Sequence, residues 1–199
     1  GSPYTSTVSA GAGVPGQTTA VVPNGTAGTA TTISFKETAA AENYALALPD
    51  ALPVCVTGAS GGVGLAALQT LKLLGAHPWA VTSSPQKAGR LEAMGAEAVF
   101  VDPGDGFHRE VRRRRPEGVD AVIDCVGSTT LASAIKSTRR YGRVVAVGSI
   151  DPAPLALDVG RLVVNAIDLL ASDNVTPAAL AEAMGLVRNG QLTVVIDRI

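Results

Sequence analysis

Cysteine and histidine are scarce in this chain, and their scarcity excludes two kinds of framework. The 199 residues contain two cysteines and two histidines. Cys55 and Cys125 each lie in an apolar, strand-like run, where small buried thiols are common, so no disulfide framework is predicted. His77 and His108 form no Cys/His cluster with the spacing of zinc ligands. We therefore expect no metal site.

Excess charge and long apolar runs are also missing. The formal net charge is −1 and aromatic residues make up 4% of the chain, so neither nucleic acid nor an anionic membrane is expected as a partner. The most basic run, Arg112–Arg115, is interpreted as a solvated helix end before Pro116, because cations are favourable near a helix C-terminus. No apolar run approaches the roughly 20 residues of a membrane span. We expect a cytoplasmic protein.

Composition divides the chain into three parts. Residues 1–35 contain no charged residue and are rich in Thr, Ala, Gly and Ser, so we expect a flexible segment or a hairpin that turns on Asn24-Gly25. Residues 36–53 are predicted as a helix over 37–48 and a linker. Residues 54–199 are predicted as one dinucleotide-binding domain. Because Gly1-Ser2 resembles a cloning remnant, we expect a piece of something larger.

Strand-like and helix-like segments alternate through residues 54–199. Short apolar runs bounded by turn residues predict strands, and apolar residues at helical spacing predict helices. The predicted strands are 54–57, 78–82, 98–101, 121–126, 143–147, 164–171 and 192–196. The predicted helices are about 62–75, 85–94, 106–115, 129–139 and 177–188. This alternation predicts an α/β fold, a doubly wound parallel sheet of the Rossmann type with helices on both faces.

The first of these strands ends in a glycine-rich turn. Residues 54–64 read Val-Cys-Val-Thr-Gly-Ala-Ser-Gly-Gly-Val-Gly. Glycines at such positions allow a tight turn, close approach of a pyrophosphate and close packing of helix on strand. The amides at the head of the following helix then face the anion. An ordinary turn that binds nothing is the alternative. The candidate binding residues are Gly58, Ser60, Gly61, Gly62, Val63 and Gly64.

The end of the second strand favours NADP over NAD. A ribose-binding acid is expected about 20 residues after the turn, but Val81-Thr82-Ser83-Ser84 contains none. Ser83, Ser84 and Lys87 can instead bind and neutralise a 2′-phosphate, with Arg90 one turn further. The same residues also suit a plain helix start, with Ser84 as N-cap. We expect NADP(H) as the cofactor.

Two further loops are candidates for the nicotinamide and its ribose. Gly127 follows the fourth strand, and Val147, Gly148 and Ser149 follow the fifth. Ligands of open α/β sheets lie at the carboxyl ends of strands. Plain turn chemistry explains these glycines equally well.

Five ordered segments together identify a family resemblance. The turn also fits the Thr-Gly-x-x-x-Gly-x-Gly pattern of short-chain dehydrogenases, but their Tyr-x-x-x-Lys and Asn-Asn-Ala-Gly motifs are missing. The sequence instead resembles the cofactor domain of zinc-independent medium-chain reductases, the quinone oxidoreductase and enoyl reductase group. The segments are Ile33–Ala40, the glycine turn running on to Gln69, Ser83–Lys87, Gly118–Gly127 and Tyr141–Gly148, and Met94–Glu97 also fits.

The resemblance implies NADPH binding and hydride transfer to an α,β-unsaturated carbonyl or a quinone. Members of that family place a β-rich catalytic domain before the cofactor domain, whereas here about 50 residues precede the first core strand. We therefore expect little or no turnover from this chain alone, with a catalytic domain or a second copy as the partner. Excision from a multidomain synthase, such as a polyketide synthase, fits the pattern. A non-catalytic domain with a structural or cofactor-dependent interaction role is the alternative.

No catalytic residue is assigned from the sequence. Tyr44 is the only tyrosine expected near the cleft, and its role as proton donor is a guess. Asp124 has the chemistry of a catalytic acid, but its inward strand position favours a structural role or contact with a ribose.

Overall fold

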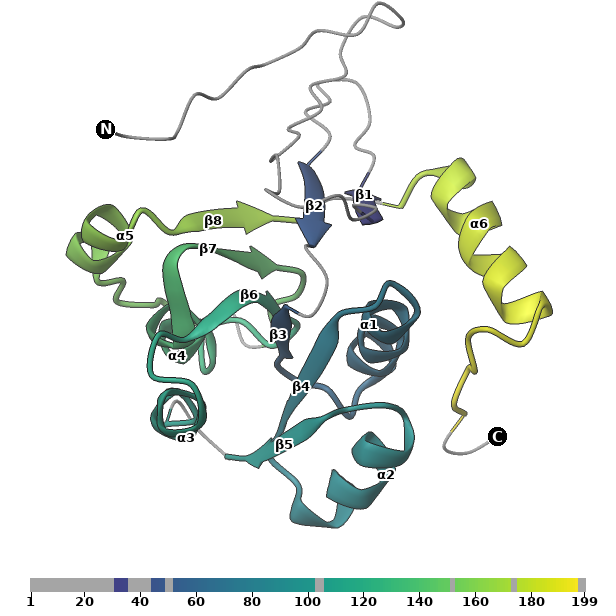
Figure 1. The fold of residues 1–199 in the computed structure, drawn as a ribbon, viewed down its shortest axis with the longest axis horizontal. Helices are drawn as coiled ribbons and strands as arrows, with labels where there is room; N and C mark the ends of the chain where they lie inside the picture. The colour runs from purple at the N-terminus through teal and green to yellow at the C-terminus, as the bar shows by residue number, and fades with distance from the viewer. Residues whose placement is uncertain are drawn as a thin grey trace, which may run out of the picture.

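The computed structural model describes residues 31–35, 44–48, 52–102, 106–150, 153–172 and 175–196. Six parallel strands form one sheet in the order β5-β4-β3-β6-β7-β8 (Figure 1). They are β3 (Pro53–Val56), β4 (His77–Thr82), β5 (Ala98–Val101), β6 (Val119–Asp124), β7 (Thr138–Ala146) and β8 (Asp168–Ala171). The chain starts at the centre, runs outward to β5 and returns to β6 beside β3. This reversal confirms the predicted doubly wound fold.

Helices connect the strands and cover both faces of the sheet. They are α1 (Gly62–Leu73), the short 3₁₀ turn η1 (Pro85–Lys87), α2 (Ala88–Ala93), α3 (His108–Arg114), α4 (Leu131–Ser137), α5 (Val159–Asn165) and α6 (Pro177–Arg188). Val54 and Val56 of β3 belong to a buried cluster that includes Leu68 of α1. Between them, Cys55 belongs to a second cluster that includes Val111 of α3. Alternate residues of one strand thus face opposite helix layers, as in a sheet buried on both sides.

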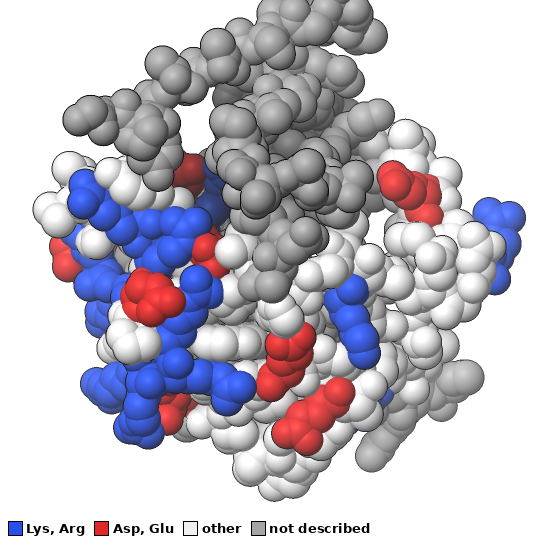
Figure 2. Space-filling view, in the orientation of Figure 1, with Lys and Arg blue, Asp and Glu red and all other residues white. Residues whose placement is uncertain are grey.

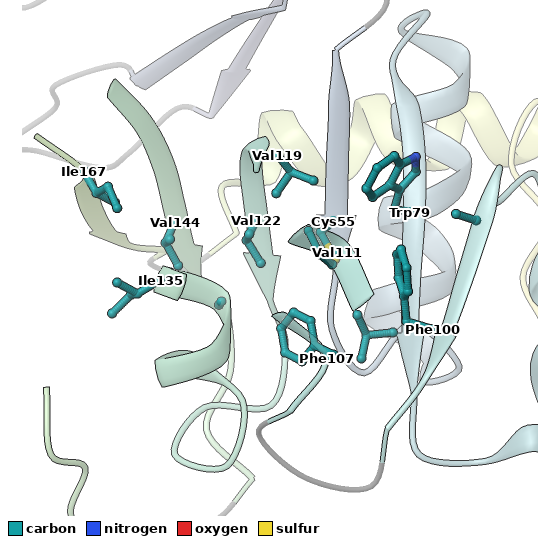
Figure 3. Close-up of a cluster of buried hydrophobic side chains, with 13 residues drawn as sticks. Cys55, Trp79, Phe100, Phe107, Val111, Val119, Val122, Ile135, Val144 and Ile167 are labelled. Carbon is teal, nitrogen blue, oxygen red and sulfur yellow. The ribbon is translucent and has the colours of Figure 1, made fainter. Parts of the chain in front are cut away.

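The second cluster carries the aromatic part of the core. Figure 3 shows Trp79 of β4 beside Phe100 of β5, and their ring centroids are 5.6 Å apart in a tilted arrangement. Phe107, just before α3, is 1% exposed and lies in the same cluster. Each large side chain buried in this way stabilises the fold by about 1.5–3 kcal/mol. The cluster therefore joins α3 and α4 to one face of the sheet, over strands β3 to β7.

The prediction of a helix over 37–48 is wrong for its last five residues. Tyr44–Leu48 form strand β2, which pairs antiparallel with β1 (Thr31–Phe35) in a separate two-stranded sheet. Helix preferences among Ala, Leu and Tyr differ by less than about 0.7 kcal/mol per residue. Pairing with the β-branched residues of β1 outweighs them. Residues 37–43 and the proposed hairpin at Asn24-Gly25 lie outside the described residues.

Two predictions near the C-terminus are also wrong. Residues 164–171 do not form one strand, because Val164 and Asn165 end α5 and β8 begins at Asp168. The Asp158 side chain accepts a hydrogen bond from the Arg161 amide and so caps α5. Residues 192–196 form no strand. Instead of bonding to a neighbouring strand, the backbone of Thr193 bonds to the Gln69 side chain on α1. Gln69 donates to the Thr193 carbonyl (3.1 Å) and accepts from the Thr193 amide (2.8 Å).

The remaining elements lie close to their predicted positions. β5 and α6 have the predicted bounds, whereas α4 is shorter than predicted because β7 already begins at Thr138. Among the described residues, no helix is long and apolar enough to cross a membrane.

Candidate functional site

The turn between β3 and α1 folds back on itself and packs tightly. Gly58 has φ +58°, which favours glycine, and its carbonyl accepts a 2.9 Å hydrogen bond from the Gly61 amide. Six residues on, a Cβ at Gly64 would overlap the Gly58 carbonyl oxygen and lie 2.6 Å from the Ala59 Cα. Only glycine therefore lets α1 lie this close to the turn.

The head of α1 is open to a ligand. Gly61 is the N-cap, no side chain caps the helix, and its first turn contains no acidic residue. Gly61, Gly62 and Val63 are exposed, and the Val63 side chain is 58% accessible. The first amides of a helix have no intrahelical acceptor, and the helix dipole makes this end favourable for a negative charge. The chemistry of this turn therefore suits a phosphate group.

Thr82, at the end of β4, joins the turn to the neighbouring loop. Its hydroxyl donates to the Ser60 hydroxyl (3.3 Å) and accepts from the Ser84 amide (3.2 Å). The side chains of Ser83 and Lys87 are exposed on this loop, and Ser84 is half-buried. Ser84 is the N-cap of η1, as expected for an ordinary helix start. Its hydroxyl, however, donates to Gln86 Oε1 (2.8 Å) and does not accept from a backbone amide of the helix. The loop thus places hydroxyls and one cation beside the glycine turn.

The loops after β6 and β7 lie against one another. Gly127 has φ +98°, and a Cβ there would lie 3.0 Å from the Ser149 Cα and 3.1 Å from the Gly148 carbonyl oxygen. The Val147 amide donates to the Asp124 carbonyl at 2.8 Å. Gly148 and Ser149 are exposed. The four predicted residues of these loops are therefore brought together at the carboxyl edge of the sheet.

The same edge joins these loops to the glycine turn. A Cβ at Gly58 would lie 2.8 Å from Val126 Cγ2, in the segment that follows β6. All the residues that the sequence suggests for cofactor binding thus lie on the β3, β4, β6 and β7 ends of one edge, where the strand order reverses. That is the place where doubly wound sheets bind their ligands.

Asp124 is fully buried beneath this edge. Its Oδ1 accepts from the Thr57 hydroxyl and, at 2.5 Å, from the Thr130 hydroxyl. The Thr57 hydroxyl in turn accepts from the Cys125 amide at 3.1 Å. The second carboxylate oxygen, Oδ2, has no hydrogen-bond partner among the described residues. Because no face of this carboxyl reaches solvent, its position is that of a structural link rather than of an acid in contact with substrate.

Sequence reasoning missed Thr57, Thr82 and Thr130. Each threonine ends a strand or precedes a helix, which is a usable signal for a hydroxyl that bonds across loops. Their partners are not readable from the sequence, because Thr57 and Asp124 are 67 positions apart. Tyr44, the candidate proton donor, lies in β2, a strand of the separate two-stranded sheet.

The two thiols are chemically quiet. Burial, followed by the nearby charge of Asp124, raises the pKa of Cys125 to about 11, and the same two causes raise the pKa of Cys55 further. Neither thiol is a nucleophile near neutral pH, because the thiolate is the reactive form. Among the residues that the structure describes, no three His, Cys, Asp or Glu side chains are grouped so as to hold a metal ion.

Comparisons with known proteins agree with this geometry. The family model described as zinc-binding dehydrogenase matches residues 62–189. Acryloyl-coenzyme A reductase of Metallosphaera sedula is 35% identical over 144 residues, which are 72% of this chain and 42% of that enzyme. The crystal structure of AibC matches with a TM-score of 0.71 and 38% identity, covering 73% of this chain and 41% of that one.

A third comparison includes a nucleotide. The structure of mycobacterial Rv1454c complexed with NADPH matches with a TM-score of 0.63 and 27% identity, over 73% of this chain and 49% of that one. The chain spans less than half the length of each of these three proteins. The family match, the sheet order and the glycine turn together show that the chain belongs to the zinc-binding dehydrogenase family, with enoyl reductases among its medium-chain relatives.

Proposed function

We propose that this chain is the NADP(H)-binding domain of a cytoplasmic medium-chain reductase that acts on an α,β-unsaturated carbonyl, such as an enoyl thioester, or on a quinone. The observation that carries the proposal is the exposed head of α1, where Gly62 and Val63 present amides that no side chain caps. The relatives support the substrate class, because Metallosphaera sedula acryloyl-coenzyme A reductase is among them. Rv1454c, whose structure holds NADPH, supports the cofactor.

Each part of the carboxyl edge has a proposed role. The amides of Gly62–Gly64 hold the pyrophosphate, and Gly58, Ser60 and Gly61 shape the turn beneath it. Ser83, Ser84 and Lys87 bind the 2′-phosphate, because an ammonium and two hydroxyls favour a dianion over a free ribose hydroxyl. Gly127, Val147, Gly148 and Ser149 border the nicotinamide and its ribose. When bound, NADPH supplies the hydride, and these residues orient it.

Energy transfer from Trp79, the only tryptophan, to NADPH tests the proposal. We expect saturable binding at micromolar to millimolar NADPH. Turnover of a crotonyl thioester would support the whole proposal. Binding without turnover would support cofactor binding and assign the reductase step to a protein that also contains the part of these relatives that this chain does not span. Absence of binding at millimolar NADPH would refute it.

Lys87→Ala tests the choice of cofactor. Lys87 is exposed at the end of η1, so its removal should leave the fold intact. We expect NADPH affinity to fall about tenfold, with NADH affinity nearly unchanged, because a charge-assisted bond to phosphate contributes about 1.5–3 kcal/mol. Lys72→Ala is the matched control, since Lys72 is exposed in the last turn of α1, away from its head. Equal losses for both nucleotides would remove the 2′-phosphate assignment.

A further inference from the structure

The amino edge of the sheet, opposite the proposed nucleotide site, carries most of the cations. Residues 109–143 contain nine Lys or Arg and four Asp or Glu, and eight of the nine cations are arginines. The end of α3 adjoins the start of β7, because Arg112 Nη2 donates to the Thr138 carbonyl at 2.8 Å. Figure 2 shows Lys and Arg side chains gathered over the region that Figure 1 labels α3 and α4, with acidic side chains among them.

Several of these arginines serve the fold. Arg112 also donates to the Lys136 carbonyl at 2.9 Å, which satisfies carbonyls at the end of α4. Arg115 and Arg139 both bind the carboxylate of Asp120, whose side chain is 5% exposed. Arg143 pairs with Asp168 at 2.9 Å. These side chains are committed to internal partners.

Arg113, Arg114, Arg140 and Tyr141 differ from that group, and we call them the arginine face. All four are exposed, and the only carboxylate that pairs with any of them among the described residues is Glu110, on Arg113 at 2.7 Å. The Arg113 side chain is 75% exposed, so that pair adds little stability and exchanges readily.

The two other guanidinium groups lie over aromatic rings instead. Arg140 lies 4.8 Å from the ring centroid of Tyr141, and Arg114 lies 5.4 Å from that of Trp79. Stacking holds a guanidinium in place by its flat face and leaves the N–H groups on its edge available to a carboxylate. Because less side-chain freedom is then lost on binding, such arginines are pre-organised for ion pairing.

Tyr141 is held in an unfavourable backbone conformation. Its φ is +59°, in the left-handed region, and its side chain is 66% exposed. A non-glycine residue there costs about 1–2 kcal/mol. This strained position in β7 therefore presents an aromatic residue and a stacked arginine outward, and Tyr and Arg are among the residue types that dominate binding at protein interfaces.

We propose that the arginine face binds an acidic segment of a protein partner. The separate carboxylates of such a segment can each pair with one guanidinium group. Its side chains can also be spaced so that none lies against Glu110 or Glu117, which are interspersed with the arginines. A nucleic acid backbone is less favoured, because its continuous charge would meet those carboxylates and only one exposed aromatic residue would be available for stacking. The proposal is independent of the proposed NADPH site, which lies at the opposite edge.

Fluorescence anisotropy of a labelled decaglutamate peptide, titrated with the whole chain at low salt, tests the proposal. We expect saturable binding that Arg114→Glu with Arg140→Glu weakens about tenfold or more, through the loss of two ion pairs and new repulsion. Arg188→Glu makes a single charge reversal at the end of α6, half the change of the double variant, and should change affinity less than about twofold. Arg114→Lys with Arg140→Lys keeps the charge, and the loss of the flat, two-donor group should still weaken binding about threefold.

Three results would overturn the proposal. One is no detectable binding of decaglutamate by the unsubstituted chain. Another is equal weakening by Arg188→Glu, which would mean attraction by overall charge. The third is tighter binding of a ten-nucleotide single strand than of the peptide, which would assign the surface to nucleic acid. Retained NADPH binding in the charge-reversed variant would confirm that it is folded, since that site is at the other edge.

Discussion

The close approach of α1 to the glycine turn makes a quantitative prediction about Gly64. In Gly64→Ala the new methyl would overlap the Gly58 carbonyl oxygen, with the Ala59 Cα 2.6 Å away. Both neighbours are backbone atoms, so no side-chain rotation relieves the overlap and the turn or the helix must move. Overpacking of this kind costs about 1–3 kcal/mol. The helix preference of alanine returns about 1 kcal/mol at most. The balance is a loss of up to about 2 kcal/mol in the free energy of unfolding, about 1–3 kcal/mol below an alanine variant in the same turn that meets no clash.

Gly62→Ala is the control that the chain itself provides. Gly62 lies two residues earlier in the same helix, and a Cβ there meets nothing within 4 Å. Alanine should stabilise the fold by about 0.4–1 kcal/mol, because it restricts the unfolded chain without a clash. The two variants make the same chemical change in the same turn of α1, so their difference isolates the packing of helix on turn.

Urea unfolding followed by Trp79 fluorescence measures both variants. The midpoint should fall in Gly64→Ala and rise in Gly62→Ala, with similar slopes if both unfold in two states. NADPH titration of Gly64→Ala should also show weaker binding, since the displaced turn no longer holds its amides in place. If Gly64→Ala proved as stable as Gly62→Ala, the tight packing argued for this turn would be wrong.

Three further predictions concern one buried carboxylate, one partly buried thiol and one side chain that bonds the segment near the C-terminus. Asp124→Ala leaves the hydroxyls of Thr57 and Thr130 without their acceptor and should cost about 2–4 kcal/mol in urea unfolding, whereas Glu182→Ala on exposed α6 should cost less than about 0.5 kcal/mol. The pKa of Cys125 is raised from 9.0 to about 11, so the folded state keeps a proton that the unfolded state releases. Stability should therefore fall as pH rises from about 9 to 11, and Cys125→Ala should flatten that fall; an unchanged slope would contradict the assignment. Gln69→Ala removes both bonds to Thr193, so hydrogen exchange of the Thr193 amide should become as fast as in an open segment, and retained protection would show another cause.

The sequence predicted the sheet well where local patterns and tertiary packing agree. β5 and α6 have their predicted bounds because each is a regular pattern between clear end signals, such as Thr176 before Pro177 at the start of α6. The predicted helix over 37–48 is wrong at residues 44–48, because alanine and leucine fit a helix locally whereas pairing with Thr31–Phe35 makes these residues a strand. α5 was missed because Val163 and Val164 favour a strand, whereas the capping bond of Asp158 starts a helix.

The candidate site was only half readable from the sequence. The glycine turn, Lys87 and the loops at Gly127 and Gly148 follow from strand ends, and a parallel sheet brings its carboxyl ends to one edge whatever their side chains. The hydroxyl network could not be predicted, because it needs the register in which Val56 of β3 lies opposite Ile123 of β6. The pairing of β3 with β6 places Thr57 beside Asp124, and this pairing exists only in the folded sheet.

Strand β6 explains why this edge is rigid before any ligand arrives. Asp120 near its start binds Arg115 and Arg139, which lie close enough to the surface for their charges to be solvated. Asp124 at its end is fully buried and is held by the hydroxyls of Thr57 and Thr130 instead. Thr57 directly precedes the glycine turn, and Thr130 follows the loop of Gly127, which packs on Ser149. One carboxylate therefore joins two loops directly, and Gly127 packs the second of them against the third; the proposal assigns all three to one nucleotide. The conformational entropy of these loops is then lost when the protein folds and not when the nucleotide binds. More of the interaction free energy therefore contributes to affinity.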